Sequence, residues 1–186
     1  MKAVDPDLVR ACQRGESGAL AALADACYED VWLLALRVTG NRADAADVTQ
    51  EVFAKMATAV VAFRAESAFS TWLFRVTTNA AITALRKRRH DGGSIDDQPE
   101  QAVDRVSDLP EEAALRSDTT RRVHRALAAL SADDRAVVVL HDLEGTSTAD
   151  CAELLGITPG ALRVRLHRAH RRLAVILGSF DEPEND

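Results

Sequence analysis

The chain has 186 residues, a length that suits one domain or two small ones. Apolar residues make up 47% of the chain and aromatic residues only 4%, a composition that favours packed helices over paired strands. The formal net charge of −6 argues against a uniformly basic nucleic-acid-binding protein, so the placement of the charges matters more than their sum.

Composition also argues against secreted, membrane-spanning and metal-stabilised proteins. Residues 1–7 lack the apolar core of a secretory signal, and no stretch approaches the ~20 apolar residues of a membrane span. We therefore expect a cytoplasmic protein without membrane insertion. Cys12, Cys27 and Cys151 are odd in number and lack a C-x-x-C pair, which predicts buried, reduced thiols; whether any is redox-active stays open.

Helical patterns recur in the first half of the chain. Apolar spacing predicts helices over residues 8–28 and 29–39, the second ended by Gly40 in a left-handed cap. Asn41 is the predicted N-cap of the next helix. The buried stripe of that helix consists of Val48, Val52, Met56, Val60 and Phe63. A further helix over residues 69–89 ends in a basic run.

An acidic segment follows this basic run. Residues 91–118 hold nine acids and two arginines, a local net charge of −7 that exceeds the deficit of the whole chain. The segment contains the chain's only Gly-Gly pair and lacks sustained apolar periodicity. It is therefore predicted to be a flexible linker between two helical domains.

Four shorter helices are predicted after the linker. They cover residues 121–130, 134–142, 148–155 and 159–177. Ser131 and Ser147 are the predicted N-caps of the second and third, Gly145 and Gly156 are the breaks that follow them, and Pro159 opens the last.

The last two helices have the pattern of a helix-turn-helix, because a turn of about three residues around Gly156 separates them. The apolar face of the last helix consists of Leu162, Leu166, Ala169, Leu173 and Ile176. Its basic face consists of Arg163, Arg165, His167, Arg168, Arg171 and Arg172. Arginine forks match phosphate and guanine, and the helix N-terminus at Gly160 offers amide donors, so we expect this helix to bind DNA.

Two other interpretations of this helix compete with DNA binding. A basic amphipathic helix standing alone is equally well a solvated face, but the capped helix and glycine turn before it favour DNA binding here. His167 and His170 lie three residues apart, yet no carboxylate or cysteine accompanies them nearby in the sequence. We therefore expect no metal site and no cofactor.

Two parts of the chain resemble one protein family. Residues 44–53, Asp-Ala-Ala-Asp-Val-Thr-Gln-Glu-Val-Phe, and residues 63–79, Phe-Arg-Ala-Glu-Ser-Ala-Phe-Ser-Thr-Trp-Leu-Phe-Arg-Val-Thr-Thr-Asn, closely resemble region 2 of extracytoplasmic-function (ECF) sigma factors. Residues 126–131 and 156–165 resemble region 4 of the same family. The order and spacing of the two regions also agree with the family.

The resemblance implies an all-α fold of two small domains. Residues 1–90 would form the region 2 helical bundle and residues 119–178 the region 4 helix-turn-helix, joined by the acidic linker 91–118 and followed by an acidic tail, 179–186. The implied function is that of an alternative sigma factor, which binds core RNA polymerase, recognises the minus-35 and minus-10 promoter elements and promotes strand opening. Such a protein is not an enzyme.

The resemblance also implies roles for particular residues. Those implied to dock on the beta-prime clamp helices of core polymerase are Asp44, Asp47, Gln50 and Glu51. Those implied to contact the minus-10 element are Arg64, Ser67, Phe69, Arg75, Asn79, Arg86, Lys87, Arg88 and Arg89. Those implied to contact the minus-35 element are Pro159, Gly160, Arg163, Arg165, His167, Arg168 and Arg171. Within the minus-10 set, Phe69 could equally belong to the core. For the nearby Trp72, which is not in the set, core packing is preferred.

The family implies further partners, namely the beta flap of the polymerase and a dedicated anti-sigma factor. The competing hypothesis is a free-standing helix-turn-helix regulator, whose N-terminal half would be a sensor or dimerisation domain. Such a regulator has no reason to carry the block of residues 44–79. An enzyme using Cys and His is disfavoured because no nucleophile sits beside a paired base and an orienting carboxylate.

Overall fold

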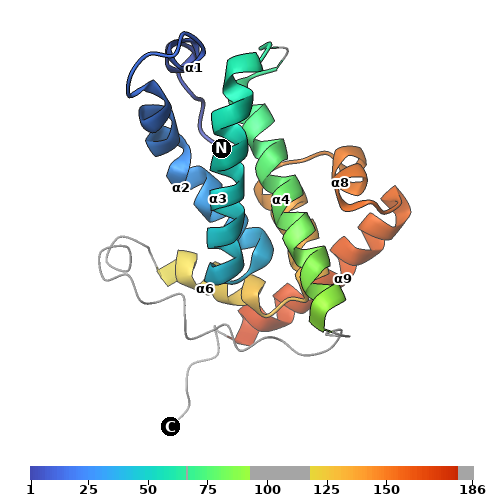
Figure 1. Ribbon diagram of the computed structural model, residues 1–186. Helices are drawn as coiled ribbons and strands as arrows, with labels where there is room; N and C mark the ends of the chain where they lie inside the picture. The colour runs from blue at the N-terminus through green and yellow to red at the C-terminus, as the bar shows by residue number, and fades with distance from the viewer. Residues whose placement is uncertain (66, 93–117, 180–186) are drawn as a thin grey trace. The chain divides into compact units, whose positions relative to one another are not determined.

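The structure is a computed structural model that describes residues 1–65, 67–92 and 118–179, and these ranges are helical with no strand among them (Figure 1). The helices are α1 (Pro6–Gln13), α2 (Ala19–Thr39), α3 (Arg42–Ala59), α4 (Phe69–Gly92), α6 (Asp118–Ala128), α7 (Ala132–Val138), α8 (Thr148–Leu155) and α9 (Pro159–Ser179). A 3₁₀ turn, η1 (Val60–Ala62), follows α3, and a π-helical turn, η2 (Val139–Leu143), follows α7. The all-α fold class is thereby confirmed.

The chain divides into two compact units. The first comprises Met1–Thr39 and Ala43–Ala84, and the second comprises Gly40–Arg42 and Leu85–Asp186. The first unit thus holds α1, α2, nearly all of α3 and most of α4, and the second holds α6 to α9. No described helix is both long enough and apolar enough to cross a membrane.

The prediction of one continuous helix over residues 8–28 was wrong. α1 ends at Gln13 and α2 begins at Ala19. Gly15 and Gly18 between them adopt φ of +71° and +78°, a left-handed conformation that ends a helix and that glycine reaches without strain. α2 then runs without a break to Thr39, so the expected boundary at residue 29 does not exist.

The buried stripe predicted for the third helix is confirmed over most of its length. Val48, Val52, Met56 and Val60 are each at most 2% exposed, and Phe63 is half-buried. In the first unit α2, α3 and α4 run side by side (Figure 1). The inward faces of α2 and α4 are equally apolar and contribute Leu23, Val31, Leu34, Leu73 and Ala80 to this core. Apolar burial at spacings of three and four therefore holds the first unit together.

The second unit is organised around α9, which contacts α6, α7 and α8. Its Leu162, Leu166 and Ala169 are buried as predicted, while Leu173 and Ile176 are half-buried. The helix predicted over residues 134–142 differs from the structure, because α7 gives way at Val138 to the wider π-helical turn. That turn is closed by a hydrogen bond from Glu144 N to Val139 O at 3.0 Å.

The ends of the predicted acidic linker and tail also differ from the structure. Asp91 and Gly92 belong to α4, Asp118 belongs to α6, and Ser179 belongs to α9. The remainder of the predicted linker, 93–117, and of the tail, 180–186, lies outside the described residues.

Two neighbouring threonines in α4 allow a test of this core. Thr77 Oγ1 donates to Leu73 O at 2.8 Å, whereas the buried Thr78 Oγ1 has no hydrogen-bond partner in the described structure. Because an unsatisfied buried hydroxyl costs about 1–3 kcal/mol, Thr78→Val should raise the free energy of unfolding by about 1 kcal/mol. Thr77→Val is the matched control and should not stabilise, since it removes a made hydrogen bond. Urea unfolding followed by circular dichroism measures both; equal effects would contradict the prediction.

Candidate nucleic-acid interface

The helix-turn-helix of the second unit is fixed by local capping. Ser147 Oγ accepts a hydrogen bond from Asp150 N at 3.1 Å, which starts α8. Gly156 ends it in the left-handed conformation, with φ of +65°. Thr158 Oγ1 then accepts from Ala161 N at 3.2 Å, and α9 begins at Pro159. The serine cap, the glycine break and the proline start predicted from the sequence are thus all confirmed.

The outward face of α9 carries most of the residues expected at the minus-35 element. The exposed ones are Pro159, Gly160, Arg163, His167, Arg168 and Arg171. Arg165 is half-buried. Val164, which lies outside the predicted set, is 67% exposed on the same helix. An exposed valine on a basic helix can pack on a thymine methyl group. The sequence signal that could have identified Val164 is an apolar residue at a position that helical periodicity places outward.

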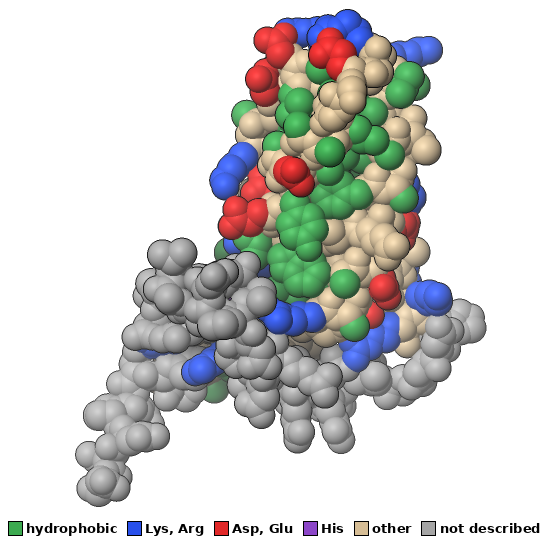
Figure 2. Space-filling model, turned by 60° about the vertical axis from the view of Figure 1, so that its left-hand side comes forward, with side chains coloured by type: hydrophobic (Ala, Val, Ile, Leu, Met, Phe, Trp, Pro, Cys, Tyr) green, Lys and Arg blue, Asp and Glu red, His purple; other side chains and the backbone are tan. Residues whose placement is uncertain are grey.

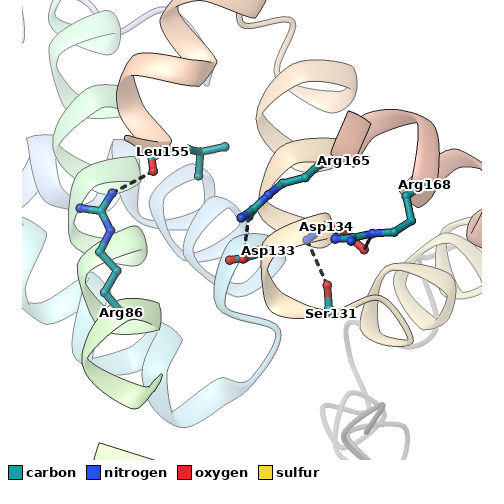
Figure 3. A network of polar contacts seen from close by, with 7 residues as sticks. All are labelled: Arg86, Ser131, Asp133, Asp134, Leu155, Arg165 and Arg168. Atoms are coloured by element: carbon teal, nitrogen blue, oxygen red, sulfur yellow. Dashed lines mark hydrogen bonds and ion pairs between the residues drawn. The ribbon is translucent and has the colours of Figure 1, made fainter. Parts of the chain in front are cut away.

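Two arginines of the predicted set are ion-paired within the protein (Figure 3). Arg165 Nη1 lies 2.6 Å from Asp133 Oδ2. Arg168 donates from Nε and Nη2 to both carboxylate oxygens of Asp134, at 3.1 and 2.6 Å. Asp134 is only 1% exposed. Sequence reasoning missed both acids, because an acid in the first turn of α7 is already explained by the positive end of the helix dipole.

A second carboxylate joins α9 to the turn after α7. Asp142 accepts from His170 Nε2 at 2.6 Å and from His141 Nδ1 at 2.8 Å. His170 therefore contacts a carboxylate of the protein, and no cluster of side chains suited to a metal occurs in the described ranges. Burial acts to raise the pKa of Asp142, but the hydrogen bonds and positive charge of His170 and His141 lower it overall.

The lowered pKa of Asp142 predicts a pH dependence of stability. A carboxylate with a folded pKa below its unfolded value stabilises the fold above the unfolded pKa, about 4, and loses that contribution as pH falls through the folded pKa. We expect the melting temperature of the native protein to fall more steeply between about pH 4 and pH 3 than that of Asp142→Asn. Glu153→Gln, an exposed change on α8, is the control and should follow the native curve. Parallel curves for Asp142→Asn and the native protein would contradict the prediction.

The residues implied to dock on core polymerase lie along α3. Asp47, Gln50 and Glu51 are exposed, and Asp44 is half-buried. Glu51 also forms an ion pair with Lys55 one turn later. They lie opposite the buried stripe of α3, so the helix presents a polar face to solvent.

A stacked aromatic pair lies beside this polar face. The rings of Tyr28 on α2 and Phe53 on α3 are 6.0 Å apart and nearly parallel, at 9°. Tyr28 is 54% exposed. Figure 2 shows apolar side chains gathered on one face of the molecule, with acidic and basic side chains around them. Sequence reasoning missed the pair because its members are 25 positions apart (53 − 28).

The segment between η1 and α4 is anchored at both ends by aromatic side chains. Phe63 and Phe69 meet edge to face with centroids 5.3 Å apart, and Trp72 contacts both. Gln13 Nε2 donates to Phe63 O at 2.8 Å and ties the segment to α1. Phe69 is only 6% exposed, so its buried side chain belongs to this aromatic cluster.

The described residues between these anchors are exposed, and one of them has a strained backbone. Arg64 and Ser67 are exposed, and Glu66 lies outside the described residues. Ala65 has a φ of +54°, a left-handed conformation that costs a residue with a Cβ about 1–2 kcal/mol. Such strain concentrates at functional sites, and the segment is therefore a candidate functional element; the roles of Arg64 and Ser67 stay predictions.

Of the polar residues expected at the minus-10 element, Arg75, Asn79 and Arg86 share one face of α4, and Lys87 and Arg88 lie on other sides of the helix. Arg75, Asn79, Arg86 and Lys87 are exposed, and Arg88 is half-buried. Arg86 Nη2 also donates to Leu155 O at 3.0 Å (Figure 3). The side chain of Arg89 lies outside the described residues.

Comparison with known proteins decides the family. Residues 23–90 match sigma-70 region 2, and residues 120–173 match sigma-70 region 4. The chain is 37% identical over 173 residues to the ECF RNA polymerase sigma factor SigL of Mycobacterium tuberculosis (strain Erdman), an alignment that covers 88% of this chain and 93% of that one. The chain belongs to the ECF RNA polymerase sigma factors. It is therefore an alternative sigma factor that acts in transcription initiation, with a DNA-binding helix-turn-helix in region 4.

Two other proteins support this assignment. The ECF RNA polymerase sigma factor SigW of Bacillus subtilis is 26% identical over 172 residues, which cover 89% of this chain and 92% of that protein. Among solved structures, the sigma factor RpoE of Bartonella quintana, in complex with the anti-sigma factor NepR, superposes with a TM-score of 0.55 at 25% identity. That superposition covers 83% of this chain and 92% of the other. Sigma factors are not enzymes.

The three cysteines of this sigma factor are free and buried, as expected. Burial raises the pKa of Cys27 and of Cys151 to about 11, and that of Cys12 is also raised. Because the thiolate is the reactive form, we expect native protein to react with a thiol reagent such as DTNB at pH 7.5 at least 100-fold more slowly than protein unfolded in urea. Release of the coloured product gives both rates. A burst of one thiol per native chain would contradict the prediction.

Proposed function

We propose that the two halves of this sigma factor recognise different promoter elements. Helices α1 to α4 bind core RNA polymerase and the minus-10 element, and helices α6 to α9 bind the minus-35 element. The observation that carries this proposal is the basic, solvent-exposed face of α9 in a capped helix-turn-helix, with Arg163, His167 and Arg171 along it.

The polar face of α3 is the proposed docking surface for the beta-prime clamp helices. Asp47, Gln50 and Glu51 are exposed along the helix, with Asp44 at its start. Carboxylates presented on a rigid helix can pair with basic side chains of a partner and steer its approach. The stacked Tyr28 and Phe53 provide an apolar contact next to these charges.

The segment from Arg64 to Phe69 and the polar face of α4 form the proposed minus-10 surface. A base flipped out of the duplex costs a few kcal/mol of unstacking, which a preformed segment can return through contacts. Arg64 and Ser67 are exposed between Phe63 and Phe69 in the chain, where they can contact such a base. Arg75 and Asn79 would contact the same strand from α4, and the basic run from Arg86 to Arg89 would bind its phosphates.

The N-terminal half of α9 is the proposed minus-35 reader. Of the first helical amides, that of Gly160 is left for a phosphate, because Pro159 has no N–H and the next two amides bond to Thr158. Arg163, His167 and Arg171 would face the groove. The beta flap of the polymerase would hold this unit in register upstream of the minus-10 element.

The proposal extends to regulation and location. The superposed sigma factor from Bartonella quintana is bound to an anti-sigma factor, which supports a partner of this kind for the present chain. The protein would act in the cytoplasm, where the polymerase transcribes, and would need no cofactor and catalyse no reaction of its own.

Run-off transcription tests the proposal. Bacterial core polymerase, the full chain and a library of candidate promoters should yield transcripts that are absent without the chain. Asn79→Ala and Arg163→Ala should each lower the yield about tenfold, since each removes a contact worth about 1–3 kcal/mol. Arg14→Ala, which removes an exposed positive charge outside these surfaces, is the control and should leave the yield unchanged.

The competing hypothesis gives a different result. A free-standing regulator would bind one DNA sequence selectively without core polymerase and would support no transcript with it. Gel-shift titration of the chain alone against the enriched promoters distinguishes the two, because the proposal requires core polymerase for selective binding.

A further inference from the structure

Neighbouring acids on α7 hold two arginines of α9 in different ways (Figure 3). Asp133 contacts Arg165 at Nη1, over 2.6 Å. Asp134 contacts Arg168 at Nε and Nη2, over 3.1 and 2.6 Å. The two guanidinium groups are therefore engaged through different edges.

The edge matters because guanine is recognised by two parallel N–H groups of arginine, which donate to its O6 and N7. In Arg168 the Nε–Nη2 edge is occupied by both oxygens of Asp134. In Arg165 only Nη1 is engaged, and no described residue bonds to its Nε or Nη2. Arg165 thus keeps a complete bidentate edge while its position is fixed by a carboxylate.

Burial separates the two pairs further. The Asp134 side chain is 1% exposed, so the carboxylate cannot give up its arginine without leaving a buried charge unpaired. The side chains of Asp133 and Arg165 are 27% and 30% exposed, and this pair is within reach of solvent and of a DNA strand. The Arg168 side chain is itself 60% exposed, but its Nε–Nη2 edge is bound to the buried carboxylate, so Arg168 anchors α9. Arg165 is 30% exposed and keeps its Nε–Nη2 edge open.

We propose that Asp133 is a specificity-determining positioning residue of the minus-35 reader, which holds Arg165 by Nη1 so that its Nε–Nη2 edge contacts one guanine. The inference rests on the proposed function and adds to it a residue that itself touches no base. A free arginine samples many rotamers and can meet several neighbouring acceptors, whereas a held one has a single direction and loses less entropy on binding.

The charge of Asp133 has a second consequence that a purely structural residue would not have. The carboxylate repels phosphate, so it weakens binding to unselected DNA. Asp133→Asn, which keeps the size of the side chain, should therefore lower discrimination between sequences and at the same time strengthen unselective binding. A loss of folding would instead weaken both.

The experiment uses the full chain assembled with bacterial core polymerase and promoter DNA randomised over the minus-35 element. Bound DNA is sequenced after one round of selection, and affinities for the best site and for its single-base variants are then titrated at two salt concentrations. With Asp133→Asn, we expect discrimination at one G·C pair to fall about tenfold. We also expect the logarithmic salt slope for unselected DNA to steepen by about one unit.

Three further variants keep the result interpretable. Arg165→Lys retains the charge and removes the bidentate edge, so it should lose discrimination at the same base pair. The double variant should then be no worse than Arg165→Lys alone, because both changes remove one interaction. Glu153→Gln removes an exposed negative charge from α8 and is the control for net charge. It can change the salt slope but should leave discrimination unaltered.

The possible outcomes distinguish the role of Asp133 from the proposed function. Unchanged discrimination in Asp133→Asn, or losses at different base pairs in Asp133→Asn and Arg165→Lys, would overturn the role of Asp133 and leave the proposed function standing. A native holoenzyme that enriches no sequence at all would overturn the proposed function, and the role of Asp133 with it. Circular dichroism melts of every variant identify any loss of folding.

Discussion

The ion pair between Asp134 and Arg168 is the interaction on which the second unit depends. A carboxylate that is 1% exposed would be costly without a positive partner, by several kcal/mol in a fully buried site and by less here because Arg168 is 60% exposed. The pair fixes α9 to α7 at a point where the apolar contacts of Leu162, Leu166 and Ala169 alone would let the helix slide or rotate. Hydrophobic burial is non-directional, and a bidentate pair is directional. The buried acid therefore adds a fixed direction to the apolar packing that turns the basic face outward.

This arrangement explains how an acidic chain can bind DNA. The net charge of the chain is −6, yet the exposed face of α9 carries only positive and neutral side chains. The acids that lie near the helix form ion pairs within the unit. Asp133, Asp134 and Asp142 each contact a basic side chain of α9. They thus set the orientation of the helix while most of its positive charge stays outward.

Local features were predictable from the sequence and long-range ones were not. Ser147, Gly156 and Pro159 act on their own helix ends, within a few residues, so their roles could be deduced from residue type and position. The stripe from Val48 to Val60 followed from helical periodicity. The break at Gly15 and Gly18 was missed because the apolar spacing continues across it. The partners of Arg165 and Arg168 were missed because they lie more than thirty residues earlier in the chain, a separation that periodicity does not bridge.

The aromatic anchors at Phe63 and Phe69 have an evolutionary consequence. Because the cluster with Trp72 fixes both ends of the exposed segment, the residues between them can be exchanged without disturbing the core of the first unit. Selection on mutations in this segment acts mainly on the contacts that the segment makes and hardly at all on folding. If the segment contacts the minus-10 element as proposed, a lineage of such proteins can acquire new minus-10 preferences one substitution at a time while each intermediate remains a stable protein.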